Sequence, residues 1–135
     1  MNVRTWTEEN NLKRNCSKSK EIVFTGRGTR GKSAAFPSPC LNICQVHSII
    51  ALGVVINDKL TAADHVSLLL TSCSSSLYAM RVLRDQGLPV SSLQDVFHAT
   101  VMAKLTYCAP AWFGLCSAND RTRLDAFLRR CKRYG

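Results

Sequence analysis

Three stretches with helical hydrophobic spacing fill the second half of the chain, and they restrict its fold more than any other feature. Each begins with a Ser or Thr that has an Asp or Gln three residues later: Thr61 with Asp64, Ser91 with Gln94, and Ser117 with Asp120. Such pairs are typical of helix starts, and apolar residues three or four positions apart share one face of a helix. The sequence therefore predicts three amphipathic helices that pack together.

The inward faces of these helices follow from the same spacing. Gly87-Leu88-Pro89 is expected to end the first helix and Pro110 the second, because proline cannot continue the backbone ladder. On the third helix, Arg129, Arg130 and Arg133 are expected to face outward. The predicted inward residues are Val66, Leu69, Leu70, Cys73, Leu77 and Met80 on the first helix, Leu93, Val96, Phe97, Val101, Leu105 and Cys108 on the second, and Leu124, Phe127, Leu128 and Cys131 on the third.

The first half of the chain has a different pattern. Residues 3–12 predict a short amphipathic helix, and residues 20–24, 41–47 and 50–56 predict strands rich in apolar and β-branched residues. Residues 25–39, rich in Gly, Pro and Ser, predict a long hairpin loop. The expected fold class is α+β: a short N-terminal helix and a small antiparallel sheet in residues 1–58, followed by a three-helix bundle in residues 59–135.

Positive charge is concentrated at the two ends of the chain. Residues 1–40 carry eight Lys/Arg and three Asp/Glu, residues 41–112 carry four of each, and residues 113–135 carry six and two. Basic ends around a neutral middle favour a polyanionic partner such as RNA or DNA. A generic solubilising surface is the alternative interpretation.

The composition also bears on location. The N-terminus, MNVRTWTEENN, has no apolar signal core, and the longest apolar stretch, residues 49–56, is shorter than the roughly 18 residues of a membrane span. We therefore expect an intracellular protein of the nucleus or cytoplasm that is not secreted and does not contact a membrane.

One segment fits the spacing of a phosphate-binding P-loop. Gly26 is followed by Gly31-Lys32-Ser33 after an apolar stretch. A P-loop also needs a helix directly after its Lys and Ser, to hold the phosphates at the helix N-terminus. Pro37 and Pro39 leave room for only about one helical turn. We interpret the segment as a basic loop and keep nucleotide hydrolysis as an alternative.

Seven cysteines are present, an odd number without any CxxC pair. They are expected to be free thiols or small apolar residues. Cys40, Cys44 and His47 are the nearest approach to a ligand cluster, but a zinc site needs a fourth ligand and tighter pairing. No metal site and no cofactor are therefore predicted.

Four separate patches resemble one family. Trp6-Thr7-Glu8-Glu9-Asn10-Asn11-Leu12 with Asn15-Cys16-Ser17-Lys18-Ser19-Lys20-Glu21-Ile22-Val23-Phe24, then Leu52-Gly53-Val54-Val55-Ile56 with His65, then Tyr107-Cys108-Ala109-Pro110-Ala111-Trp112, and finally Arg123-Leu124 with Arg129-Arg130, occur in this order. They are similar to the end of the palm and the thumb of the reverse transcriptases of non-LTR, LINE-type retrotransposons. The resemblance covers nearly the whole chain.

The resemblance implies a role for several residues. Lys18 and Lys20 match palm lysines, and Leu52 and Gly53 match the primer-grip strand. Arg129, Arg130 and Arg133 match a thumb helix that follows a template–primer hybrid. The basic loop adds Arg27, Arg30 and Lys32 as candidate contacts to phosphates. The implied partners are RNA, DNA or an RNA–DNA hybrid, and the missing portion of the polymerase.

The same resemblance implies no catalysis by this chain alone. Reverse transcriptases hold two Mg²⁺ ions with aspartates, and this sequence contains no Asp-Asp pair. We expect a fragment without catalytic residues, in which Mg²⁺ would matter only within a complete polymerase. The alternative is an inactive retroelement remnant or a protein-interaction module. The patch from Trp6 to Phe24 also resembles the N-terminal region of alkylated DNA repair proteins, but the sequence offers no His/Asp iron ligands for that chemistry.

Overall fold

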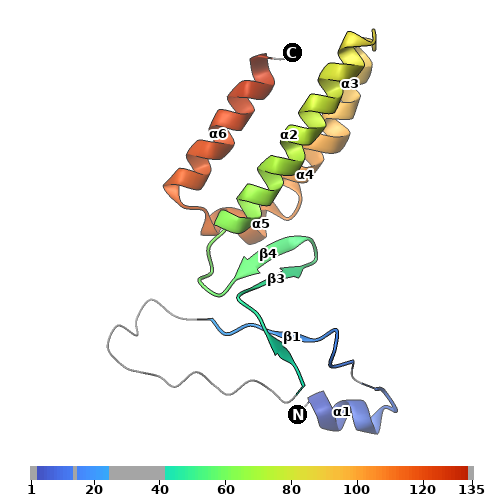
Figure 1. The fold of residues 1–135 in the computed structure, drawn as a ribbon, viewed down its shortest axis with the longest axis vertical. Helices are drawn as coiled ribbons and strands as arrows, with labels where there is room; N and C mark the ends of the chain where they lie inside the picture. Colours follow the sequence, from blue (N-terminus) through green and yellow to red (C-terminus); the bar gives the residue numbers. More distant parts are fainter. Residues whose placement is uncertain (1–2, 14, 25–41, 134–135) are drawn as a thin grey trace.

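The computed structural model describes residues 3–13, 15–24 and 42–133 (Figure 1). The described chain is elongated, with a helical part at one end and short helical and strand segments at the other. Between them lies a two-stranded hairpin that packs under the helices. The predicted α+β class is confirmed by this arrangement.

The N-terminal segment is short and weakly packed. Helix α1 spans Val3–Glu9 and ends before Asn11, whose φ of 53° lies in the left-handed region. The predicted helix over residues 3–12 is therefore too long. Trp6 is 44% exposed and Leu12 is 54% exposed, so the expected apolar face is not buried.

A short parallel pair follows. Strand β1 (Lys20–Glu21) lies beside β2 (Cys44–Gln45), with Lys20 opposite Cys44. The expectation of an antiparallel hairpin across residues 25–39 is wrong, because the two flanking strands run parallel. A parallel pair needs a connection of a dozen residues or more, which this long segment provides.

The antiparallel part of the sheet is one hairpin. Strand β3 (Ser48–Ala51) pairs with β4 (Val54–Asn57), Ile50 lying opposite Val55. Leu52 and Gly53 form the two-residue turn, with φ of 47° and 81°. The predicted continuous strand over residues 50–56 is wrong for this reason. Positive φ at both turn positions matches the twist of the paired strands, and Leu is an unusual residue there.

The helical part begins with the longest helix. Helix α2 spans Ala63–Asp85 and ends before Gly87, which has a φ of 86° as expected for a helix-ending glycine. Its start differs from the prediction. Thr61 does not cap it; instead the Asn57 side-chain amide donates to Thr61 Oγ1 at 2.8 Å and to Asp64 Oδ2 at 2.9 Å.

The predicted second helix is divided into several segments. Helix α3 (Val90–Phe97), the π-helical turn η1 (His98–Met102) and α4 (Ala103–Thr106) follow one another directly. Helix α5 (Ala109–Trp112) comes after Cys108, whose φ is 48°, and η2 (Phe113–Leu115) continues it. The chain therefore leaves the helix at Tyr107, and Pro110 lies in the first turn of α5. Ser91 caps nothing, because Pro89 is the residue before α3 and no side chain caps that helix.

The last helix, α6 (Ala118–Arg133), follows the prediction most closely. Ser117 and Asp120 form the expected reciprocal cap: the Asp120 amide donates to Ser117 Oγ at 3.2 Å, and the Ser117 amide and hydroxyl both donate to Asp120 Oδ2, at 3.0 and 2.6 Å. Leu124 and Phe127 are buried as expected. Leu128 is 39% exposed, so its predicted inward position is wrong.

The core lies where α2 meets its neighbours. Val66, Cys73 and Val101 are fully buried there. The hairpin contributes Val54 to the same cluster, so β4 packs with the helices. Other members are Ala62, Leu69, Leu77, Met80, Trp112, Cys116, Leu124 and Phe127. The division of the chain at residue 58 into two domains stays a prediction.

Candidate functional site

The outer face of α6 carries the strongest charge in the described chain. The helix contains six Lys/Arg and two Asp, a net charge of +4. Arg129, Arg130 and Arg133 are all exposed, as the helical spacing predicted. No hydrogen bond or ion pair holds these three side chains within the described ranges. Their guanidinium groups are therefore available to contact phosphates.

Two other arginines of α6 have structural contacts. Arg123 Nη2 donates to Ser67 Oγ on α2 at 3.1 Å, and Arg123 Nη1 lies 3.6 Å from Asp120 Oδ1. Arg121 lies over the Phe113 ring, 5.4 Å from its centroid. These contacts tie the first half of α6 to the rest of the fold. Within the described residues, the basic residues near its C-terminal end make no such contacts. They lie at the negative end of the helix dipole, which favours positive charge there.

The candidate residues of the first half lie far from α6. Lys18 and Lys20 are exposed and belong to the end of the molecule that carries α1 and β1 (Figure 1). The last turn of α6 is at the opposite end. These residues do not form one compact site. The remaining candidates of that half, Arg27, Arg30 and Lys32, lie outside the described residues, as does the Gly26 to Ser33 pattern.

The predicted primer-grip residues occupy a turn. Leu52 is 88% exposed at the tip of the β3–β4 hairpin, and its carbonyl oxygen accepts a hydrogen bond from the Tyr107 hydroxyl at 3.0 Å. A Cβ atom built on Gly53 would lie 3.2 Å from Tyr107 Cε1. The tip is thus held against the loop before α5, and the Leu52 side chain projects into solvent.

A buried histidine lies behind this hairpin. His65 is 7% exposed, its ring centroid lies 5.1 Å from that of Trp112, and its Nδ1 accepts the Val55 amide at 3.3 Å. Because burial disfavours the charged ring, the pKa of His65 is lowered from its ordinary value. The contacts are those of a structural residue that joins α2, β4 and α5.

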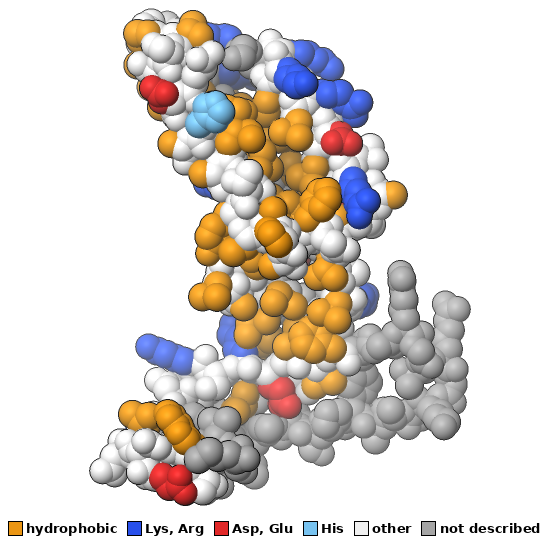
Figure 2. All heavy atoms as spheres, turned by 180° about the vertical axis from the view of Figure 1, so that it is seen from behind, with side chains coloured by type: hydrophobic (Ala, Val, Ile, Leu, Met, Phe, Trp, Pro, Cys, Tyr) orange, Lys and Arg blue, Asp and Glu red, His pale blue; other side chains and the backbone are white. Residues whose placement is uncertain are grey.

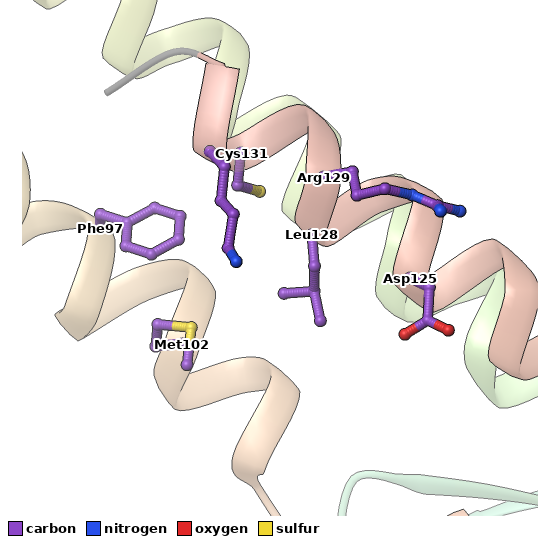
Figure 3. Close-up of a pocket in the computed structure, with 7 residues that line it drawn as sticks. Phe97, Met102, Asp125, Leu128, Arg129 and Cys131 are labelled. Atoms are coloured by element: carbon purple, nitrogen blue, oxygen red, sulfur yellow. The ribbon is translucent and has the colours of Figure 1, made fainter.

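An open apolar groove runs between the α3–η1 segment and α6, and the sequence analysis missed it. Its larger hollow has a volume of about 600 Å³, and a second hollow of about 230 Å³ shares two of its lining residues. Figure 3 shows Phe97 and Met102 on one side of the larger hollow and Leu128 on the other. We call this feature the α3–α6 groove; its lining residues are Leu77, Met80, Arg81, Arg84, Val90, Leu93, Gln94, Phe97, Met102, Asp125, Leu128, Arg129, Cys131 and Lys132.

The surface view places this groove in a wider pattern. Figure 2 shows apolar side chains gathered along the middle of one face, with Lys and Arg side chains along the edge formed by α6. The signal that could have revealed the groove is Leu128: adjacent helical residues lie roughly 100° apart, so with Phe127 at the centre of the buried face Leu128 lies at its edge.

The described cysteines, Cys16, Cys44, Cys73, Cys108, Cys116 and Cys131, are free. Within residues 3–13, 15–24 and 42–133, no group of three His, Cys, Asp or Glu side chains is placed to hold a metal ion. His47 Nδ1 lies 2.9 Å from Asp58 Oδ2, and Cys40 lies outside the described residues.

Helix α2 is long and apolar enough to cross a membrane when judged by length and composition alone. The core helix of a soluble protein passes the same test, so the observation carries little weight. In this fold one face of α2, including Val66, Leu69 and Cys73, packs into the core.

Comparison of the chain with protein-family models, with curated proteins and with solved structures finds no match.

Proposed function

We propose that this chain is the palm-end and thumb fragment of a retroelement reverse transcriptase, and that it binds the backbone of an RNA–DNA hybrid without polymerising. The observation that carries the proposal is the exposed basic face of α6, with Arg129, Arg130 and Arg133 directed to solvent. Guanidinium contacts to phosphates give affinity that is independent of sequence and that falls with salt.

The anchoring of α6 to the rest of the fold supports this role. Helix α6 is anchored at its start by the Ser117–Asp120 cap and by the Arg123 to Ser67 hydrogen bond. Its basic residues near the C-terminal end lie on a rigid element, which reduces the entropy lost when they meet a polyanion. The proposal assigns no catalytic role to this chain, because its sequence contains no Asp-Asp pair.

The proposal is tested by titrating a labelled RNA–DNA hybrid with the protein, followed by fluorescence anisotropy, at roughly 50 and 200 mM salt. The expected result is saturable binding that weakens steeply with salt. Replacing Arg130 and Arg133 by Ala should weaken binding and reduce the slope of log K against log salt concentration by about two, one for each lost phosphate contact.

A charge-matched control separates specific contacts from net charge. Lys13 and Lys59 are exposed and lie outside α6, so the double replacement of these residues by Ala removes the same charge elsewhere. It should leave hybrid binding nearly unchanged. Equal losses in the two double variants would refute the assignment to α6, and absence of binding by the folded wild type would refute the proposal.

The alternative function is a protein-interaction module or an inactive remnant. It is favoured by the exposed hairpin, in which Ile50 is 68% and Leu52 is 88% exposed. Exposed apolar strands invite pairing with another chain. Hydrogen exchange tests this: protection of β3 that increases with protein concentration indicates association through the strand, and protection confined to residues 61–133 indicates a folded helical part with a frayed N-terminal half.

A further inference from the structure

We infer that the α3–α6 groove is a docking site for an acidic amphipathic helix of a partner protein. This inference does not depend on the proposed nucleic-acid binding. It starts from the apolar surface of Phe97, Met102 and Leu128, which line an open hollow large enough for several side chains (Figure 3). Apolar surface in contact with water is less stable than the same surface buried against a partner, and an apolar patch of this size is typical of an interaction site.

The charge around the hollow selects the partner. Among the lining residues, four are basic, namely Arg81 and Arg84 on α2 and Arg129 and Lys132 on α6, and one, Asp125, is acidic. The rim therefore has a net charge of +3. A helix with apolar residues on one face and Glu or Asp at the edges of that face would match both the floor and the rim.

Backbone geometry favours a helix over an extended peptide. The walls of the groove are α2, α3, η1 and α6, whose backbone groups are paired within the helices. They offer side chains and no strand edge, so an extended peptide would leave its own amides unpaired. A helix satisfies its own backbone and needs only apolar contacts and ion pairs, as in other helix-in-groove complexes.

Other occupants fit less well. A nucleic-acid backbone would find the positive rim but would leave the apolar floor unfilled, whereas Arg130 and Arg133 are exposed on α6 and do not line the groove. A second copy of the chain would bring a net charge of +9 against a positive rim. Charge therefore opposes self-association at this groove.

The probe for the test is a fluorescein-labelled amphipathic peptide of about 18 residues, roughly 27 Å as a helix. It carries Leu at positions i, i+3, i+4 and i+7 and Glu beside them. Two controls have the same length: one with Lys in place of Glu, and one with the acidic composition scrambled so that the helical period is lost. Binding is measured by anisotropy with the full chain.

The expected result is that the acidic helical peptide binds the wild type about tenfold more tightly than either control peptide, a preference that requires both the charge and the period. Leu128→Glu should weaken its binding about tenfold, since a carboxylate would then face the acidic partner. Leu68→Glu is the matched control, because Leu68 is 57% exposed on α2 and does not line the groove. That variant should bind like the wild type.

A second readout reports on the site itself. Cys131 lines both hollows, so bound peptide should slow its alkylation by N-ethylmaleimide, as measured by mass mapping, while the exposed Cys44 reacts at an unchanged rate. Circular dichroism establishes that Leu128→Glu is folded; if it is not, Lys132→Glu takes its place and should reduce the preference for the acidic over the basic peptide, because it lowers the net charge of the lining residues from +3 to +1.

Several outcomes would overturn the inference. Equal binding of the scrambled peptide would mean simple charge attraction. Sedimentation showing a dimer of the wild type that Leu128→Glu dissociates would assign the groove to a second copy. Protection of Cys131 by an RNA–DNA hybrid, or by phosphatidylcholine vesicles, in the absence of any protection by peptide would assign it to those partners instead.

Discussion

The hydroxyl of Tyr107 donates to the carbonyl oxygen of Leu52 at 3.0 Å and so joins the loop before α5 to the tip of the β3–β4 hairpin, 55 positions earlier in the chain. The Tyr107 ring also lies against Gly53. Strand β4 of the hairpin packs on α2. The Tyr107 contact holds the tip of the same hairpin against the loop before α5, so the hairpin is joined to the helical part at two places. Its residues belong to patches that the sequence analysis took as separate.

Removing only the Tyr107 hydroxyl should have a small effect. Tyr107→Phe keeps the ring and loses one exposed hydrogen bond, so the free energy of unfolding should fall only slightly. Urea unfolding measures this change. Tyr78→Phe is the control, because Tyr78 is 68% exposed, and it should change nothing. A similar loss in both variants would contradict the proposed link.

Gly53→Ala should destabilise the protein more strongly. The φ of 81° disfavours any side chain by about 1 kcal/mol, and the new Cβ would press on the Tyr107 ring. Two glycines serve as controls in thermal unfolding: Gly87 has a φ of 86° but open space, and Gly114 has open space without a positive φ. The expected order of destabilisation is Gly53, then Gly87, then Gly114. Destabilisation by Gly87→Ala that equals or exceeds that by Gly53→Ala would argue against the contact with the ring.

The cap of α6 gives a third prediction. Ser117→Ala removes the acceptor for the Asp120 amide and the donor to the Asp120 carboxylate, and should cost about 1 kcal/mol of stability. Ser91→Ala is the matched control, because no side chain caps α3. It should leave the urea midpoint nearly unchanged. Comparable losses of stability in the two variants would mean that the Ser91 side chain also stabilises the start of its helix.

Stability should depend on pH through His65. Burial lowers its pKa in the folded state, so the unfolded chain binds a proton more readily. The stabilising contribution is complete above the ordinary value of 6.5, and it is lost as pH falls through that value toward the folded pKa. Unfolding midpoints between about pH 7.5 and about pH 5 should therefore decline, and less so in His65→Gln. His98→Asn is the control, since His98 is exposed; it should keep the wild-type decline.

Thiol reactivity should follow burial. Burial raises the pKa of Cys73 and Cys116, which reduces the reactive thiolate as well as access to it. Cys44 is exposed. Alkylation under native conditions, mapped by mass spectrometry, should modify Cys44 first and Cys73 last among the six cysteines that the structure describes. Early modification of Cys73 would show that α2 opens locally, and the same experiment in urea provides the reference for full access.

The sequence predicted most of the helical architecture because local rules decide it. The spacing of Val66, Leu69 and Cys73 correctly identified the buried face of α2, and the pair Ser117 and Asp120 correctly located the start of α6. Both depend on residues within one or two turns of each other, where backbone geometry alone sets which side chains meet.

The same local rules failed where a distant residue decides the outcome. Thr61 has the pattern of a cap but is held by Asn57, and Ser91 has the pattern without making the bond. Leu52 and Gly53 form a turn that contacts Tyr107, a residue 55 positions after Leu52 in the chain. The spacing predicted an inward position for Leu128, which is wrong, because its exposure depends on how far the α3–η1 segment lies from α6.

What the sequence alone determined, then, is the α+β class, the buried face of α2, the outward direction of Arg129, Arg130 and Arg133, and the charge of the two chain ends. The tertiary structure decided that β1 and β2 run parallel, that the basic Lys20 lies at the opposite end of the molecule from α6, and that an apolar groove stays open beside Leu128. The physical reason is range: hydrophobic period and capping act within a few residues, whereas strand direction, charge separation and groove formation depend on contacts between segments tens of residues apart.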